Sequence, residues 1–419
     1  MTVHVIGAGL AGLSAAVELA AAGQHVILSE SAPQAGGRCR SYADAATGLT
    51  IDNGNHLVLS GNGAVMAYLA RIGASDRLRG PEHTAFGFVD LKSGRADKGA
   101  FAVAPNDGPV PWWIFSAARR VPGTGPLDYL ALAKLLRTPA GATVGEVVAT
   151  HGPLWDKLLE PVLLAALNTP PATASATLTS AVVRGSLARG GAACRPLIAH
   201  PTLAAAFVDP ALAYLRAKGA EIRTRRLTAL GIDGNRLTSL TFADGGEPVD
   251  GAVILAVPAP VAATLLPGLN VPTAFNPIVS LHFAVPPPPN ASAILGVLGG
   301  ITEWIFAFPD RISVTISAAN AVVDRDRADL AATVWAEVAA ALGLTAPLPA
   351  WQVVKERRAT FAATVEQDAL RPATATATRN LFLAGDWTQT GLPSTIEGAI
   401  RSGVTAAGLA QEARPATRG

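Results

Sequence analysis

The chain begins with two short apolar runs on either side of a longer alanine-rich segment. Residues 3–6 and 25–28 are mostly apolar, and residues 10–22 between them are apolar or small except for Glu18. Runs of the first length predict buried strands, whereas the longer segment, which stops at Gly23, predicts a helix. We therefore expect the chain to begin with a strand–helix–strand unit.

The turn between the first strand and the helix carries glycines with GxGxxG spacing. Gly7 permits a tight turn, Gly9 lets a pyrophosphate approach the backbone, and Gly12 lets helix and strand pack closely. Glu30 ends the second strand, where a carboxylate holds ribose hydroxyls. This motif serves NAD or FAD equally. The predicted cofactor residues here are Gly7, Gly9, Leu10, Ala11, Gly12 and Glu30.

Two further segments bear on the choice of cofactor. AGGRCRS at residues 35–41 supplies paired glycines and an arginine that can hold phosphate bidentately. Near the other end, a strand at 381–384 leads through Gly-Asp to STIE at 394–397, a pattern typical of a helix start and of anion binding. Asp386 could accept from ribityl hydroxyls. These segments add Gly36, Gly37, Arg38, Gly385, Asp386, Ser394, Ile396 and Glu397 to the predicted site.

Composition and charge exclude several classes of protein. A chain of 419 residues favours two packed domains, and a formal charge of +2 gives no nucleic-acid footprint. Cys39 and Cys194 lack CxxC spacing, so we expect reduced thiols and no metal site. MTVHVIGAG reads as strand and turn rather than a signal peptide, and no long apolar run predicts a membrane span. We expect a cytoplasmic protein, with peripheral contact on the inner face of the cell membrane as an open alternative.

The GxGxxG turn with its acid, the GGR segment and the late LAGDW…EGA element together resemble the FAD-binding flavoprotein superfamily. This superfamily includes amine oxidases, phytoene desaturases and related isoprenoid enzymes. The resemblance implies an α/β fold in which a Rossmann-like FAD-binding domain is interleaved with a mixed α+β substrate domain. The FAD-binding domain would comprise residues 1–65, 201–264 and 355–413, the substrate domain residues 66–200 and 265–354, and a flexible tail residues 414–419.

Other phrases narrow the resemblance to the hydroxysqualene dehydroxylases of bacterial hopanoid pathways, also described as squalene-associated FAD-dependent desaturases. The phrases are IDNGNHLVLSG at 51–61, LLEPVLLAALNTPPATAS at 158–175, RGG at 189–191 and FVDPALAYL at 207–215. The resemblance implies that hydroxysqualene loses its allylic hydroxyl as water and takes a hydride from reduced FAD to give squalene. No second nicotinamide fingerprint is visible, so the electron donor is not identified.

The leaving hydroxyl needs an acid, for which the resemblance and the sequence offer two candidates. His56 lies in DNGNH, a segment that passes the flavin in similar enzymes and includes Gly54 and Asn55 as cofactor contacts. Asn55 could also orient water or substrate. Glu160 interrupts LLEPVLL, so an apolar cavity would raise its pKa. His56 could instead only bond the backbone or flavin, and Glu160 could be a simple helix-end carboxylate.

Less favoured candidates are Asn168, Asp209 and His200. Asp209 precedes a proline and is most simply a helix cap, whereas His200, also before a proline, is expected to be structural.

The stretch PVPWWIFSAARRVPG at 109–123 places two tryptophans beside two arginines. Trp prefers the membrane interface, and Arg meets anionic head groups. Leu-rich sequence with Lys134 and Arg137 follows, so residues 109–140 form a candidate membrane contact near the mouth of a lipid tunnel. Core or tunnel-wall packing of the tryptophans is the alternative.

Three rival functions stay open at this point. A phytoene-type desaturase would run the flavin oxidatively, and the nucleotide motifs do not separate the two directions. An amine oxidase usually frames its flavin with aromatic side chains, of which only Trp387 stands near the late motif. A lipid escort protein without catalysis would have lost the flavin residues that are present here.

Overall fold

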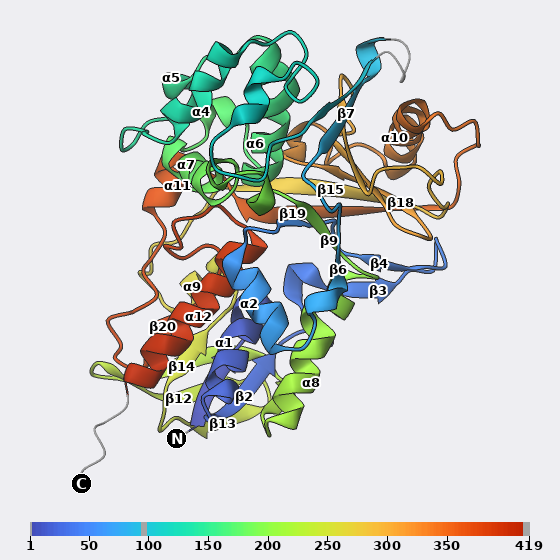
Figure 1. Cartoon of the computed structure of the whole chain (residues 1–419). Helices are drawn as coiled ribbons and strands as arrows, with labels where there is room; N and C mark the ends of the chain where they lie inside the picture. Colours follow the sequence, from blue (N-terminus) through green and yellow to red (C-terminus); the bar gives the residue numbers. More distant parts are fainter. Residues whose placement is uncertain (1, 94–98, 414–419) are drawn as a thin grey trace.

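The structure is a computed structural model that describes residues 2–93 and 99–413 (Figure 1). The flexible tail expected at 414–419 lies outside the described residues. Segments from the two ends and the middle of the chain form a nucleotide-binding unit, at the bottom of the view. The intervening segments form a larger sheet and a group of helices above it.

Five parallel strands in the order β10-β2-β1-β14-β20 form the centre of the nucleotide-binding unit. Their bounds are β1 Thr2–Ile6, β2 His25–Glu30, β10 Glu221–Thr224, β14 Val253–Leu255 and β20 Leu381–Leu383. The apolar runs that predicted β1 and β2 are buried, as expected of parallel strands covered on both faces. This architecture confirms the expected α/β class.

Helices cover one face of this sheet and an antiparallel meander covers the other. The helices are α1 Leu10–Ala21, α2 Gly63–Arg71, α8 Asp209–Ala217 and α12 Ile396–Glu412. The meander consists of β11 Leu227–Asp233, β12 Arg236–Phe242 and β13 Gly245–Pro248. A further helix, α9 Ala259–Leu265, follows the meander in the chain. The first and last long helices pack together, and Ser14 Oγ of α1 donates to the Ile400 carbonyl of α12 at 3.1 Å. The two ends of the chain therefore share one core.

A seven-stranded sheet in the order β19-β15-β18-β17-β16-β7-β8 lies between the nucleotide-binding unit and the upper helices (Figure 1). Its strands are β7 Phe86–Asp90, β8 Ala100–Val103, β15 Phe275–Phe283, β16 Ile294–Leu298, β17 Trp304–Ala307, β18 Ile312–Ile316 and β19 Trp351–Phe361. Pairing is antiparallel except between β16 and β7. The domain boundary expected at 354/355 falls inside β19, which pairs with β15 as far as Phe361.

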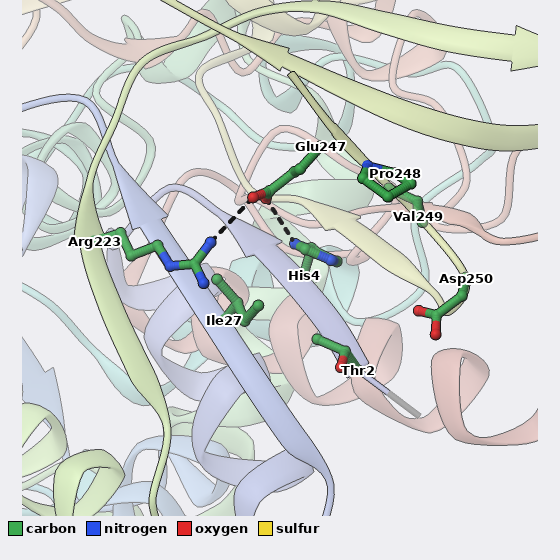
Figure 2. Close-up of a pocket in the computed structure, with 8 residues that line it drawn as sticks. All are labelled: Thr2, His4, Ile27, Arg223, Glu247, Pro248, Val249 and Asp250. Carbon is green, nitrogen blue, oxygen red and sulfur yellow. Dashed lines mark hydrogen bonds and ion pairs between the residues drawn. The ribbon is translucent and has the colours of Figure 1, made fainter. Parts of the chain in front are cut away.

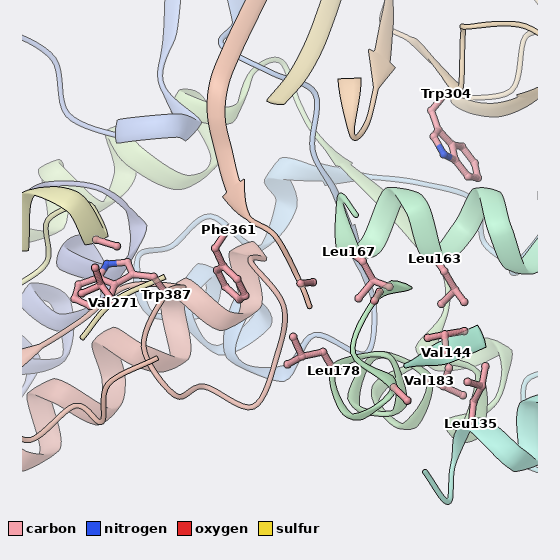
Figure 3. Close-up of a cluster of buried hydrophobic side chains, with 14 of the residues drawn as sticks. Leu135, Val144, Leu163, Leu167, Leu178, Val183, Val271, Trp304, Phe361 and Trp387 are labelled. Carbon is pink, nitrogen blue, oxygen red and sulfur yellow. The ribbon is translucent and has the colours of Figure 1, made fainter. Parts of the chain in front are cut away.

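The two faces of this sheet pack against different helices. Val314 and Ile316 of β18 pack with α10, Arg327–Leu342. Trp304 of β17 faces the opposite way, into a cluster shared with the upper helices. Those helices are α4 Leu130–Leu135, α5 Val144–Val147, α6 Glu160–Leu167 and α7 Ala176–Gly185. Figure 3 shows this cluster, which includes Leu163 and Leu167 of α6, Trp304, Phe361 and Trp387.

Two small sheets and a short helix complete the fold. They are β3 Ser41–Ala43 with β4 Thr50–Asp52, β5 Leu57–Leu59 with β9 Pro196–Ala199 and β6 Leu78–Arg79, and α11 Val365–Ala369. Between β4 and β5 runs the loop that contains DNGNH. In the part of the chain that the structure describes, every helix is too short or too polar to cross a lipid bilayer.

Candidate cofactor and substrate site

The glycine turn after β1 has the shape that its spacing predicts. Gly7 adopts a φ of 103°, and a Cβ atom on Gly12 would lie 1.8 Å from the Gly7 carbonyl oxygen. At Gly9, the N-cap of α1, no described atom lies within 4 Å of the position a Cβ would take. The turn thus leaves open space at the first N–H groups of α1, beginning with Leu10 and Ala11, where a phosphate is stabilised.

Glu30 reaches this turn from the end of β2. One oxygen of its carboxylate, Oε2, accepts from the Ala8 N–H at 2.7 Å, and Oε1 accepts from the Ala32 N–H at 2.8 Å. The carboxylate is therefore fixed beside the glycine turn, as the motif requires. Its contact with a ribose stays a prediction.

The GGR segment packs directly against the glycine turn. The Gly36 N–H donates to the Ala8 carbonyl at 2.8 Å, and both Gly36 and Gly37 have positive φ, at 107° and 55°. The next residue, Arg38, donates from Nη2 to both carboxylate oxygens of Asp386 at 2.7 Å. Its other Nη donates to the Ala359 carbonyl. The pKa of Arg38 is raised, chiefly by the charge of Asp386.

The late motif supplies the opposite wall. The Gly385 N–H donates to Ser402 Oγ at 2.8 Å, which fixes the bend before Asp386. The helix start predicted at 394–397 is confirmed in α12, but Thr395 is its cap and accepts from the Gly398 N–H at 3.0 Å. Within residues 2–93 and 99–413, the buried Ser394 Oγ finds no hydrogen-bond partner.

Glu397, one of the predicted cofactor residues, contacts the start of another helix. Its carboxylate accepts from the N–H groups of Ala64 and Val65 at 3.2 and 3.0 Å, and from Arg401 Nε at 2.9 Å. Since the first N–H groups of α2 lack partners within their own helix, this carboxylate caps α2. The side chain of Glu397 is therefore directed to α2, and the cofactor contact expected of this residue stays a prediction.

These residues fit a flavin dinucleotide. Gly9 leaves room for a pyrophosphate at the start of α1, and Glu30 stands where a ribose would lie. Arg38 keeps 43% of its side chain accessible while it is paired with Asp386. The Ser394 Oγ, which has no partner among the described residues, and the N–H groups at the start of α12 are polar groups of the kind that a flavin ring uses.

The DNGNH loop passes this cradle. Burial, and then the charge of Arg38, lowers the pKa of His56 to about 4. The positive guanidinium and the loss of water both disfavour imidazolium, so His56 is poorly suited to the role of acid for which it was a candidate. A neutral imidazole can still donate one hydrogen bond.

Asn55 connects the same loop to the seven-stranded sheet. Its Nδ2 donates to the Val314 carbonyl and to Thr315 Oγ1, both at 3.2 Å. Asp52, at the loop's start, accepts from Ser41 Oγ and the Leu203 N–H, and pairs with Arg311 at 3.5 Å. The loop is thus held at both ends. Gly54 lies next to the ring of His56.

Glu160 is placed differently from the expectation. It is exposed at the first turn of α6, whereas Leu159, Leu163 and Leu167 of the same helical turns are buried. The helical period of 3.6 turns Glu160 away from the apolar stripe, so no apolar cavity surrounds it. Its assignment as a buried acid is wrong.

Glu303, which precedes β17, has the property expected of Glu160. Burial raises the pKa of Glu303 to about 7, although the N–H and hydroxyl of Ser317 favour its charged form. Its Oε2 accepts from the Ser317 N–H at 2.7 Å. A lone carboxylate in the apolar run GGITEWIFAF is the signal that could have indicated it.

The weaker candidates have structural surroundings. Asn168 ends α6 with a φ of 46° and accepts from the Ala318 N–H at 2.6 Å, while its Nδ2 donates to Thr360 Oγ1 at 2.9 Å. It therefore ties α6 to the sheet. Asp209 begins α8 and makes no capping hydrogen bond among the described residues, so its expected capping role is wrong.

The tryptophan stretch divides between surface and core. Two 3-10 turns, Trp112–Phe115 and Pro126–Tyr129, lie against each other. Trp112 and Phe115 are 67% and 64% exposed, whereas Trp113 is 5% exposed and meets Tyr129 edge-on with ring centroids 4.9 Å apart. Membrane contact and core packing are therefore both available to neighbouring tryptophans.

A pocket elsewhere in the nucleotide-binding unit lies away from these residues. Figure 2 shows it over the parallel sheet, where Glu247 lies between Arg223 and His4 at 3.1 and 3.4 Å. It starts at Thr2, the opposite end of β1 from the glycine turn. It is thus separate from the cofactor cradle.

Comparison with known proteins agrees with this cradle. The chain matches the family described as flavin containing amine oxidoreductase over residues 10–410. It is 52% identical to a hydroxysqualene dehydroxylase of Rhodopseudomonas palustris and 50% identical to one of Sinorhizobium fredii, in each case over 97% of this chain and 98% of the relative. An oxidoreductase from Methanosarcina mazei shares the fold, with a TM-score of 0.71 at 17% identity over 97% of this chain and 99% of that one. The chain belongs to the flavin containing amine oxidoreductases and, within them, to the hydroxysqualene dehydroxylase family.

Proposed function

We propose that this protein uses FAD to convert hydroxysqualene into squalene by reductive dehydroxylation. The observation that carries the proposal is 52% identity to a hydroxysqualene dehydroxylase over 97% of the chain. The cradle around Gly9, Arg38 and Asp386 supports it, because a protein that had lost flavin binding would have no reason to keep these groups together.

Beyond the substrate, the reaction needs one hydride, which carries two electrons, and one further proton. The allylic C–O bond breaks, the leaving oxygen takes a proton to become water, and the carbon takes a hydride. Reduced FAD supplies that hydride and is oxidised in the process. An electron donor outside this chain regenerates the reduced cofactor. The chain's own residues bind the cofactor, orient the lipid, exclude water and deliver the proton.

Glu303 is the proposed source of the proton. The acid must hold a proton at neutral pH, and a pKa of about 7 meets this requirement. His56, with a pKa of about 4, is uncharged there and is proposed as a neutral hydrogen-bond donor beside the cofactor. Glu160 is exposed and takes no part.

The apolar cluster suits a hydrocarbon of this size. It extends from Trp387, beside the late motif, to Trp304 and the upper helices. Phe88 stacks on Phe101 with ring centroids 5.2 Å apart and meets Trp304 at 5.6 Å. Aromatic side chains of this kind bind an isoprenoid chain through buried apolar area rather than hydrogen bonds.

The proposed lipid source is a bilayer surface, reached through a loop patch formed by Val110, Trp112, Phe115, Leu127 and Leu130. Of the ten exposed large apolar side chains in the described residues, these five fall within one short stretch. Exposed Arg119, Lys134 and Arg137 lie in the same stretch and complement anionic head groups. Clustered exposed aromatics beside cations favour an interfacial contact.

An anaerobic single turnover tests the reaction. The flavin of the purified protein is reduced with dithionite, hydroxysqualene is added, and flavin absorbance and extracted lipid are followed together. Squalene formed in step with flavin reoxidation is the expected result. A fully reduced, flavin-loaded protein that forms no squalene would contradict the proposal, and a desaturase activity on saturated isoprenoids would then be tested with oxidised enzyme.

A further inference from the structure

Trp304 and Thr315 face each other across two strands of the seven-stranded sheet. They are directly opposed in the antiparallel pair of β17 and β18. Val314 and Ile316 pack on the α10 side, so alternation along β18 puts Thr315 on the other face, where Trp304 joins the apolar cluster. Side chains of opposed residues on one face are neighbours.

Asn55 comes to Thr315 from the DNGNH loop with its amide in a fixed orientation. Nδ2 donates to the Val314 carbonyl and to Thr315 Oγ1. A carbonyl can only accept, so this contact requires the nitrogen and turns Oδ1 away from it. Asn55 is 8% exposed, and Oδ1 finds no donor among residues 2–93 and 99–413.

Trp304 has a hydrogen-bond donor without an acceptor. Its side chain is buried, at 6% exposed, and its indole Nε1–H has no acceptor in the part of the chain that is described. Two other buried tryptophans have acceptors: Trp335 donates to the Ala346 carbonyl at 3.2 Å, and Trp387 donates to the Val257 carbonyl at 2.9 Å. A buried polar group without a partner costs free energy unless a ligand or water supplies one.

We propose that Asn55 and Trp304 bind the hydroxyl group of the substrate. A hydroxyl donates one hydrogen bond and accepts others, so it would donate to Asn55 Oδ1 and accept from Trp304 Nε1–H. Both groups flank Thr315 on the face that borders the apolar cluster. An isolated acceptor and an isolated donor in apolar surroundings would select a ligand that carries one hydroxyl group on a long hydrocarbon chain. This inference rests on the proposed function.

The location suits the reacting carbon. Asn55 is the chain neighbour of His56, whose ring is close enough to the Arg38–Asp386 pair for both charges to influence it. Glu303, the proposed proton source, is the chain neighbour of Trp304. A hydroxyl bound at Asn55 and Trp304 would therefore lie near the cofactor cradle, while the two hydrocarbon arms lie along the apolar cluster.

Binding to the oxidised, FAD-loaded protein tests this subsite without turnover. Dissociation constants are measured for hydroxysqualene and for squalene, which lacks only the hydroxyl, by perturbation of the flavin spectrum. Wild type should prefer hydroxysqualene by roughly tenfold. Trp304→Phe removes the donor while keeping an aromatic ring, and Asn55→Leu removes the acceptor at nearly constant volume. Each should bring the preference towards unity with squalene affinity little changed.

Trp335→Phe is the matched control, because it removes an indole N–H on the far face of the sheet and should keep the wild-type preference. Equal affinity of wild type for both lipids, or full preference in Trp304→Phe, would overturn the subsite. If Trp304→Phe does not fold, Asn55→Leu tests the subsite in its place, and full preference in that variant would overturn it. A reduced wild-type protein that forms no squalene would instead overturn the proposed function, so the two failures are distinguishable.

Discussion

Arg38 and Asp386 are 348 positions apart in the chain and are joined by two hydrogen bonds of 2.7 Å. The carboxylate is 8% accessible and the guanidinium 43%. Nη2 of Arg38 donates to both carboxylate oxygens while Nη1 donates to the Ala359 carbonyl, so the guanidinium is fixed in orientation as well as paired in charge. The pair therefore holds the first and last cofactor-binding segments in one arrangement.

Asp386→Asn should weaken FAD binding by roughly 10- to 100-fold, because Arg38 loses its anionic partner. The dissociation constant of FAD for the refilled apoprotein measures this. Asp324→Asn is the control, since Asp324 pairs with Arg357 at the same 2.7 Å but both side chains are exposed. Unchanged FAD affinity in Asp386→Asn would contradict the role of the pair.

Gly9→Ala and Gly12→Ala should separate cofactor binding from folding. A Cβ at Gly12 would clash with the Gly7 carbonyl at 1.8 Å, so this change should lower the free energy of unfolding by roughly 2 kcal/mol or more. A Cβ at Gly9 meets no described atom, so the apoprotein should keep its stability while FAD affinity falls at least about tenfold. Urea unfolding of apoprotein and FAD titration measure the two effects. Equal loss of stability in both variants would argue against open space at Gly9.

The rate of single turnover should fall as pH rises through about 7, where Glu303 loses its proton. Glu303→Gln should slow squalene formation by roughly 100-fold or more and remove this titration. His56→Gln should keep the same midpoint, because the pKa of His56 lies near 4. A midpoint that disappears with His56→Gln rather than with Glu303→Gln would assign the acid to the histidine.

Glu303 should also make stability depend on pH. Its pKa is raised to about 7 from the ordinary glutamate value of 4.5, so the folded state binds the proton more tightly than the unfolded state. Stability is then greatest below about pH 4.5 and declines as pH rises through 7. Glu303→Gln should gain roughly 1–3 kcal/mol relative to wild type between about pH 5 and 8. Denaturant unfolding at several pH values measures the difference, and a constant difference would contradict the buried carboxyl.

Trp112→Ala/Phe115→Ala should reduce flotation with liposomes of anionic lipid by roughly tenfold, without loss of folding, because both side chains are exposed. Ile232→Ala removes an exposed apolar side chain outside the loop patch and should float as wild type does. Trp113→Ala should instead lower the melting temperature, since Trp113 is buried against Tyr129. Undiminished flotation of the double variant would show that the loop patch is not the dock.

Local pattern was enough to predict the glycine turn after β1 and the place of Glu30 beside it. The glycines of GxGxxG lie in one turn, and Glu30 ends the strand that follows the helix. Their spacing along the chain therefore fixes where they lie relative to one another. The start of α12 was predicted in the same way. The contacts of the Glu397 side chain were not predicted, because its partners Ala64 and Val65 lie far away in sequence.

The glutamates and the tryptophan stretch show which features local sequence patterns do not predict. Glu160 and Glu303 both interrupt apolar runs, and only their placement on α6 and beside β17 separates an exposed carboxylate from a partly buried one. Trp112 and Trp113 are adjacent, yet a single 3-10 turn sends one to solvent and the other to Tyr129. Exposure depends on what packs against an element, and the chain order does not record it.

By itself, the sequence determined the α/β class, the glycine turn, the late Gly-Asp bend and the resemblance to a flavoprotein family, because short-range backbone geometry imposes these features. Only the tertiary structure decided that Arg38 meets Asp386, that Glu303 is partly buried whereas Glu160 is exposed, and that Asn55 and Trp304 flank one threonine. Burial and charge pairing are sums over residues that the fold brings together from distant parts of the chain, so they exist only after folding.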